Sequence, residues 1–132
     1  MRRVLAAGPR YAPITVEHFQ HPRNVGRIAD ADGVGRVDDA ERETTVSLYV
    51  KLGRAGRVVR ATFRTFGCSA CIAASSMATE LLVGRATVES DTGAVLSAIE
   101  LDAALGGLPA EKRYCAALVA EAARRAVGNI VR

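Results

Sequence analysis

Apolar and polar residues alternate along two neighbouring stretches in the middle of the chain. In residues 45–52 every second side chain is Val or Leu, and residues 58–66 repeat the alternation up to a glycine. A period of two predicts half-buried strands, and the short glycine-containing turn at 53–56 predicts that they pair antiparallel. We expect four of their side chains in the core: Val46, Leu48, Val59 and Phe63.

The pattern changes to helical spacing after this strand pair. Small residues over 70–83 predict a helix that ends at Gly84, a typical position for a terminating glycine. A second helical region is expected at 88–99, with Ser90 or Asp91 as a cap. The last helix is expected over 109–127, with Pro109 in its first turn and with Leu118 and Ala122 on its buried face.

The chain before the strand pair carries weaker signals. Residues 1–12 are expected to form a flexible tail, and Pro13 precedes a short helix over 14–21 that Pro22 stops. Residues 28–43 are rich in Gly and Asp and predict irregular structure or a weak edge strand. The whole pattern predicts one α+β domain over 13–132, in which helices cover one face of a small antiparallel sheet.

Composition narrows the classes of partner. The net charge is +4, but the basic residues are scattered, no basic stripe is interleaved with aromatics, and tryptophan is absent. We therefore expect no nucleic-acid partner. No apolar stretch approaches the roughly 20 residues that span a bilayer, so no membrane partner is expected. Three cysteines do not resemble a secreted disulfide framework, and a reducing, cytoplasmic setting is expected.

The cysteines are the candidate chemistry. Cys68 lies at a predicted helix start, where free N–H groups and the helix dipole favour the thiolate, and Cys71 follows one turn later. This spacing suits metal or cluster ligation, or a redox dithiol. Cys115 lies near the start of the last helix, on its apolar face. The alternative interpretation is that Cys71 and Cys115 only pack in the core.

Four separate stretches resemble one known family, the IscU/NifU-type iron–sulfur cluster assembly scaffold proteins. They are His18-Phe19-Gln20-His21-Pro22-Arg23-Asn24-Val25-Gly26, Phe63-Arg64-Thr65-Phe66-Gly67-Cys68, Ile72-Ala73-Ala74-Ser75-Ser76, and Leu108-Pro109-Ala110-Glu111-Lys112 with Cys115 three residues on. The resemblance runs from about Val16 to Val127 and implies the IscU/NifU N-terminal fold.

The resemblance also implies a cluster site, which this chain has altered. The family uses three cysteines with an aspartate and a histidine, and two of the cysteines match Cys68 and Cys115. The first cysteine aligns near Arg42, the aspartate near Thr44, and the histidine at Tyr114. Cys71 stands where the family usually has a small residue. We therefore expect Cys68, Cys71 and Cys115 to bind the metal or cluster, with Arg42 at the rim.

Several roles around the three cysteines stay open at this point. Three thiolates leave a tetrahedral metal one ligand short. The fourth could be a water or one of five side chains: Tyr114, Asp38, Asp39, Glu41 or Glu43. Arg42 either lowers the pKa of a neighbouring cysteine or is solvated. His18 is expected to pack or cap rather than to bind metal. Lys112 belongs to a stretch that resembles the family's chaperone-docking loop, although Ala110 and Glu111 depart from it.

The expected function is an iron–sulfur scaffold or carrier that assembles a cluster, [2Fe-2S] by expectation, and passes it to apo-proteins. Zinc is an alternative occupant. Such a protein is not a turnover enzyme. Expected partners are a cysteine desulfurase and apo iron–sulfur proteins, with a chaperone as a further candidate. The alternatives are a persulfide acceptor for a desulfurase and a paralogue that acts by protein binding alone. A shared metal requires the sulfur atoms of Cys68 and Cys115 to lie about 3.5–4 Å apart.

Overall fold

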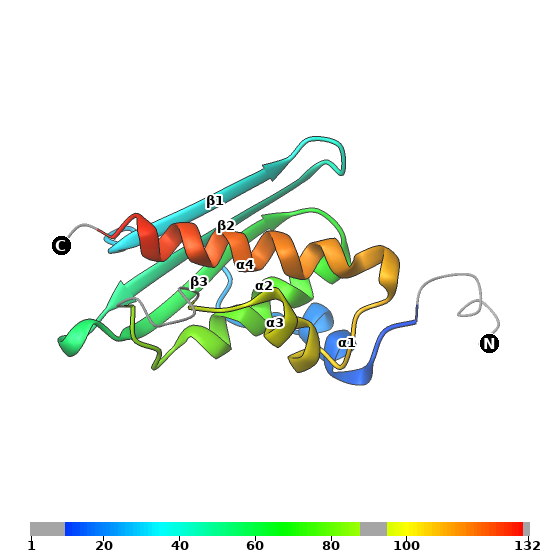
Figure 1. The fold of residues 1–132 in the computed structure, drawn as a ribbon, viewed down its shortest axis with the longest axis horizontal. Helices are drawn as coiled ribbons and strands as arrows, with labels where there is room; N and C mark the ends of the chain where they lie inside the picture. The colour runs from blue at the N-terminus through cyan, green and yellow to red at the C-terminus, as the bar shows by residue number, and fades with distance from the viewer. Residues whose placement is uncertain (1–9, 88–94, 131–132) are drawn as a thin grey trace.

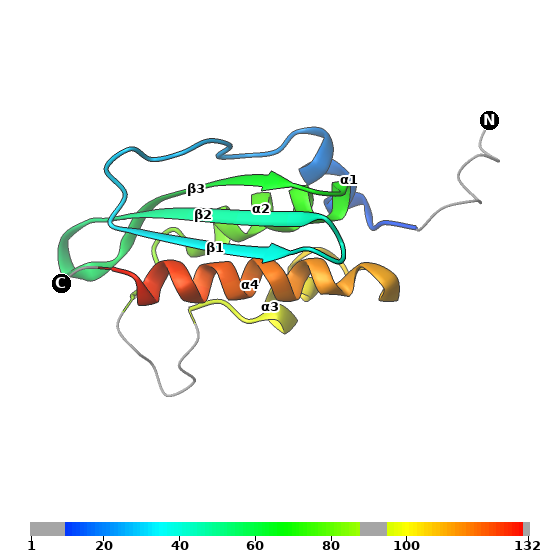
Figure 2. The same ribbon diagram turned by 90° about the horizontal axis from the view of Figure 1, so that it is seen from above.

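The computed structural model describes residues 10–87 and 95–130. Strands β1 (Gly33–Asp39), β2 (Thr44–Leu52) and β3 (Val58–Phe66) form an antiparallel sheet in the order β1-β2-β3. Helices α2 (Ser69–Leu82) and α4 (Arg113–Gly128) lie side by side on one face of this sheet, as Figures 1 and 2 show. The predicted α+β architecture is confirmed, and the weak edge strand exists as β1.

Two shorter helices pack outside this layer. Helix α1 (Pro13–Gln20) contacts α2, and helix α3 (Ala98–Ala104) packs against α4 and α2. The buried hydroxyl of Thr15 donates a 2.6 Å hydrogen bond to the carbonyl oxygen of Leu105, which joins α1 to the end of α3. Tyr11, just before α1, packs edge-on against Phe19 with ring centroids 5.9 Å apart. The rest of the expected tail, residues 1–9, lies outside the described residues.

The core fills the space between the sheet and the two long helices. Val46, Leu48 and Val50 of β2 are fully buried beneath α2 and α4, whose facing sides are rich in alanine. Two glycines of β1, Gly33 and Gly35, allow the α4 backbone to approach the strand. A Cβ atom built at Gly35 would lie 2.0 Å from the carbonyl oxygen of Ala122. Strand and helix therefore pack backbone against backbone at this position.

The prediction that Val59 lies in the core is wrong. Val59 is 56% exposed, and Val58 is buried in its place. The reason is an irregularity in the β2–β3 ladder: Lys51 pairs with Arg60 but Leu52 pairs with Val58, so the strand carries an extra residue at Val59. A bulge of this kind shifts which side chains face the core. Val46, Leu48, Phe63 and Ala122 are buried as predicted, and Leu118 is half-buried against the core.

The helix boundaries also need correction. The region expected over 88–99 falls partly on residues 88–94, including the suggested caps Ser90 and Asp91, which lie outside the described residues. Helix α3 instead begins at Ala98, where the Ser97 side chain accepts a 3.0 Å hydrogen bond from the Glu100 backbone N–H, and it continues to Ala104. Pro109 precedes a 3₁₀ turn, Ala110–Lys112, so α4 starts four residues later than expected.

Over the described ranges, no helix is both long enough and apolar enough to cross a membrane.

Candidate metal centre

The three cysteines come from two helix starts at one end of the sheet. Cys68 is the N-cap residue of α2, Cys71 lies in the first turn of that helix, and Cys115 lies in the first turn of α4. Both helices begin at the end where β3 stops and the β1–β2 turn lies (Figure 2). The α+β topology therefore brings together residues that are 47 positions apart in the chain.

The sulfur atoms lie in contact. Cys68 Sγ is 3.9 Å from Cys71 Sγ and 3.7 Å from Cys115 Sγ, and the Cys71 and Cys115 sulfurs are 2.7 Å apart. The expected proximity of Cys68 and Cys115 is confirmed. Cys71 and Cys115 are fully buried, whereas Cys68 is partly exposed, and all three are free thiols. The cluster of thiols is thus closed towards the core and accessible on the Cys68 side.

Local sequence explains why Cys68 reaches this position. Gly67 separates the end of β3 from α2, and a Cβ atom there would crowd the Thr44 side chain at 3.1 Å. The carbonyl oxygen of Cys68 then accepts hydrogen bonds from the backbone N–H groups of Cys71 and Ile72, which closes the first turn of α2. The chain can therefore turn directly from strand to helix, with the Cys68 thiol at the turn.

Electrostatics distinguish the two cysteines of α2. Burial tends to raise the pKa of Cys68, but the backbone N–H of Cys71, the Tyr114 hydroxyl, the Cys115 thiol and the Lys112 charge together lower it to about 7. The hydrogen bond with Cys115, together with burial, raises the pKa of Cys71 far above its ordinary value. Of these two thiols, Cys68 is therefore the one that ionises near neutral pH in the metal-free protein.

The first testable consequence concerns the reactivity of Cys68. We expect its alkylation rate to rise with pH around a midpoint near 7, compared with about 8.5 for an unstructured thiol. The midpoint is a better measure than the rate, because nucleophilicity falls with thiol pKa and offsets part of the gain in thiolate. Mass spectrometry after timed iodoacetamide pulses measures it, with Cys68→Ser as the control. A midpoint at 8.5 or above contradicts this expectation.

A tyrosine lies beside Cys68, and an arginine stacks on that tyrosine. The Tyr114 hydroxyl oxygen is 3.7 Å from Cys68 Sγ, and the Arg42 guanidinium lies 4.5 Å from the centroid of the Tyr114 ring. Arg42 is held in turn by Asp39, at 2.9 Å between Nη1 and Oδ2. Arg42 therefore contacts Tyr114, which in turn contacts Cys68. Sequence reasoning missed this stack, because no spacing rule joins a turn arginine to a helix tyrosine 72 residues away.

The structure also shows where Thr44 and the acidic residues near the β1–β2 turn lie. Within 10–87 and 95–130, the side chains grouped so as to hold a metal are Cys68, Cys71 and Cys115, without a carboxylate. Thr44, where the family aspartate aligns, is buried and donates its hydroxyl hydrogen to the carbonyl oxygen of Arg42. An open groove of about 440 Å³ lies beside the β1–β2 turn; Phe66, 75% exposed, lines it together with Asp38, Asp39, Ala40, Glu43, Thr44 and Thr45.

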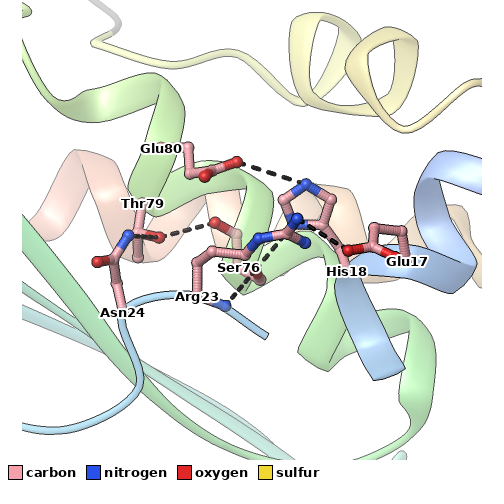
Figure 3. A network of polar contacts seen from close by, with 7 residues as sticks. All are labelled: Glu17, His18, Arg23, Asn24, Ser76, Thr79 and Glu80. Atoms are coloured by element: carbon pink, nitrogen blue, oxygen red, sulfur yellow. Dashed lines mark hydrogen bonds and ion pairs between the residues drawn. The ribbon is translucent and has the colours of Figure 1, made fainter. Parts of the chain in front are cut away.

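His18 takes a structural role on the outer side of α2, as expected. The residue is 2% exposed, with Nδ1 2.8 Å from the Ser76 hydroxyl and Nε2 3.4 Å from a Glu80 carboxylate oxygen (Figure 3). The same hydroxyl accepts a 2.9 Å hydrogen bond from the Arg23 backbone N–H, and the Asn24 amide donates to Thr79. This network attaches α1 and the segment after it to α2, which contains Cys71 and is capped by Cys68.

The second consequence is a pH dependence of stability. Burial, followed by the Arg23 charge, lowers the pKa of His18 below its ordinary value of 6.5. Below about pH 6.5 the unfolded chain then binds more protons than the folded one, so the free energy of unfolding falls as pH decreases. Urea midpoints between pH 7.5 and 5 should show this slope in the wild type and in His21→Gln, an exposed control, but less in His18→Gln. Equal slopes in all three proteins contradict the role of His18.

A family model and individual relatives both match this chain over most of its length. The model of the family described as the NifU-like N terminal domain matches residues 10–131. The chain is 43% identical over 122 residues to the iron-sulfur cluster assembly scaffold protein IscU 1 of Archaeoglobus fulgidus, covering 92% of this chain and 77% of the relative. It is 32% identical over 120 residues to the scaffold protein IscU of Azotobacter vinelandii, covering 89% and 91%.

Solved structures support the fold independently. The crystal structure of a nitrogen-fixing NifU-like protein (N-terminal) from Brucella abortus superposes with a TM-score of 0.66, covering 90% of this chain and 92% of that chain. The sequences are 17% identical, so the likeness concerns the fold.

Proposed function

Because the chain belongs to the NifU-like N-terminal domain family, we propose that it is an iron–sulfur cluster assembly scaffold whose cargo is held by Cys68, Cys71 and Cys115. The single observation that carries this proposal is the contact of three free thiols, all within 4.8 Å of one another. Thiolate sulfur is the ligand that iron–sulfur clusters use. Cys71 supplies the thiol that is absent at Arg42, so the altered sequence still provides three.

The partly exposed thiol cluster suits temporary binding of an iron–sulfur cluster. Thiol protons leave to solvent as sulfur–iron bonds form, and the partly exposed Cys68 provides a side from which iron and sulfide can enter and a finished cluster can leave. A scaffold of this kind exchanges ligands and performs no turnover reaction. We propose residues 13–132 as the scaffold domain, a [2Fe-2S] cluster as cargo and zinc as an alternative occupant.

The proposed partners follow from this chemistry. A cysteine desulfurase would supply sulfur, apo iron–sulfur proteins would accept the cluster, and a chaperone could engage the stretch that ends at Lys112. Three free thiols suit a reducing compartment such as the cytoplasm. Lys112 has a second effect whether or not a chaperone binds, since its charge acts on Cys68.

One observation favours a second candidate function, the acceptance of persulfide sulfur from a desulfurase. Cys68 is the most exposed of the three thiols, and its pKa of about 7 makes it a nucleophile at neutral pH. In that reaction the thiolate attacks the outer sulfur of the donor's persulfide, and the donor leaves as its own thiolate. A scaffold can use the same step to collect sulfur, which a two-electron reductant must then convert to sulfide, so the two functions share Cys68.

Anaerobic reconstitution with iron and sulfide tests the proposal. The wild type should develop visible absorbance bands, and Cys68→Ser should lose them. Ser69→Ala, at an exposed position next to Cys68, should retain them. A colourless wild type that takes up one labile sulfur at Cys68 from a desulfurase supports the acceptor function. A protein that does neither is a paralogue without cluster chemistry, and the proposal is then wrong.

A further inference from the structure

Three thiolates leave one position of a tetrahedral metal without a protein ligand. We propose that Tyr114 fills this position through its phenol oxygen, and that Arg42 is the residue that positions the tyrosine. The inference rests on the proposed metal- or cluster-binding role of Cys68, Cys71 and Cys115, and it extends that site by a ligand of a different chemical type.

The position of Tyr114 carries the first part of the inference. Tyr114 directly precedes Cys115 in the first turn of α4, so the backbone that presents one ligand also presents the other. Its hydroxyl oxygen lies 3.7 Å from Cys68 Sγ. Because Cys71 and Cys115 are fully buried, Cys68 marks the accessible side of the thiol cluster. The phenol oxygen therefore contacts the sulfur atom on the accessible side of the thiol cluster.

The neighbouring carboxylates are engaged elsewhere. Asp39 accepts hydrogen bonds from both the side chain and the backbone N–H of Arg42. Asp38 accepts a 2.8 Å hydrogen bond from the Thr45 hydroxyl and pairs with Arg36. Among the described residues, no carboxylate belongs to the group of side chains able to hold a metal. Tyr114, by contrast, places an oxygen donor in contact with a candidate ligand.

Arg42 stacks on the ring of Tyr114. Its guanidinium lies 4.5 Å from the ring centroid, within the range of a cation–π interaction. The ion pair with Asp39 fixes the guanidinium; Asp39 ends β1, and Arg42 lies in the turn between β1 and β2. The continuous set of contacts Asp39–Arg42–Tyr114–Cys68 therefore connects the sheet to the thiol cluster and limits the positions open to the phenol oxygen.

The chemistry of this ligation is simple. The phenol O–H bond breaks, an oxygen lone pair is donated to the metal, and the proton passes to solvent without any change of oxidation state. Iron accepts a tyrosine oxygen as a protein ligand, as the axial ligand of catalase haem shows. Binding of one metal ion must then release one more proton than three thiols account for.

Zinc binding to the apo-protein tests the proposal, since Zn²⁺ has no visible absorbance to obscure the tyrosine signal. At pH 7 a free tyrosine is protonated. The wild type should therefore show a near-ultraviolet tyrosinate difference band that saturates at one tyrosinate per zinc. Calorimetry in buffers of different ionisation enthalpy should count one more released proton for the wild type than for Tyr114→Phe. Tyr49→Phe, a tyrosine on β2, is the matched control and should behave as wild type.

Variants at position 42 test the positioning role. Arg42→Gln should keep the tyrosinate band but lower the zinc affinity by roughly ten-fold, as expected for a residue that orients a ligand. Glu41→Gln, at the exposed neighbouring position, should leave the affinity unchanged. An Arg42→Gln variant that binds zinc as tightly as the wild type refutes the role of Arg42.

The possible failures are distinguishable. Zinc binding without a tyrosinate band, with equal proton release by the wild type and Tyr114→Phe, overturns the ligand role and leaves the three-cysteine site intact. A wild type that does not bind zinc at all, while remaining folded by circular dichroism, overturns the proposed metal-binding function itself.

Discussion

Replacing Gly35 by alanine should destabilise the domain by roughly 3 kcal/mol or more, at the upper end of the range for overpacking in a core. A Cβ atom at this position would lie 2.0 Å from the carbonyl oxygen of Ala122 and 2.4 Å from the backbone nitrogen of Ala126. Both atoms belong to the backbone of α4, so no side-chain rotation relieves the clash. The helix must move away from β1, and the contacts that it makes with the strand are lost.

Urea unfolding measures this effect, and a second glycine provides the control. Gly128 lies at the end of α4 with nothing within 4 Å of a built Cβ, so Gly128→Ala should be neutral or stabilising by up to about 1 kcal/mol. Because α4 carries Cys115, Gly35→Ala should also weaken zinc binding in whatever fraction remains folded. A Gly35→Ala variant as stable as the wild type contradicts the close packing of β1 and α4.

Cys71→Ala should reduce zinc affinity by roughly a hundred-fold. Structural zinc sites with four ligands bind with about 10–16 kcal/mol, or roughly 3 kcal/mol for each ligand. Cys71 is fully buried, with its sulfur 2.7 Å from that of Cys115, so its loss removes a donor from the closed side of the site, where water cannot easily replace it. Competition with a chromophoric chelator measures the affinity.

The matched control is the next residue of the same helix. Ile72→Val removes one methylene from a half-buried side chain and should leave zinc affinity unchanged. The comparison decides between the two interpretations of Cys71, because a cysteine that only packs in the core can become alanine without affecting the metal. Unchanged zinc affinity in Cys71→Ala therefore rejects Cys71 as a ligand and leaves two thiols at the site.

The local pattern of the sequence was sufficient for the paired strands and the first long helix. Alternating apolar residues over 45–52 correspond to β2, and the small-residue run after Gly67 corresponds to α2. Edge strand β1 was ambiguous, because glycines at positions 33 and 35 read as turn residues. These glycines serve tertiary packing, because they allow the backbone of α4 to approach the strand. The sequence alone does not distinguish a glycine required for close packing from one required for a turn.

For the candidate site, too, the sequence determined one part and the tertiary structure decided the other. The sequence by itself determined which residues could bind a metal, since the spacing of Cys68 and Cys71 and their place at a helix start are local properties. The approach of Cys115 was an expectation from family resemblance until the packing of α2 beside α4 brought its sulfur 3.7 Å from that of Cys68.

Only the tertiary structure decided which side chains surround these thiols and which side chain a bulge turns outward. The stack of Arg42 on Tyr114 joins a strand turn to a helix start, and the exposure of Val59 depends on how β3 pairs with β2. Both depend on contacts between segments distant in the chain. A periodic pattern describes one segment at a time, and it therefore contains no information about such contacts.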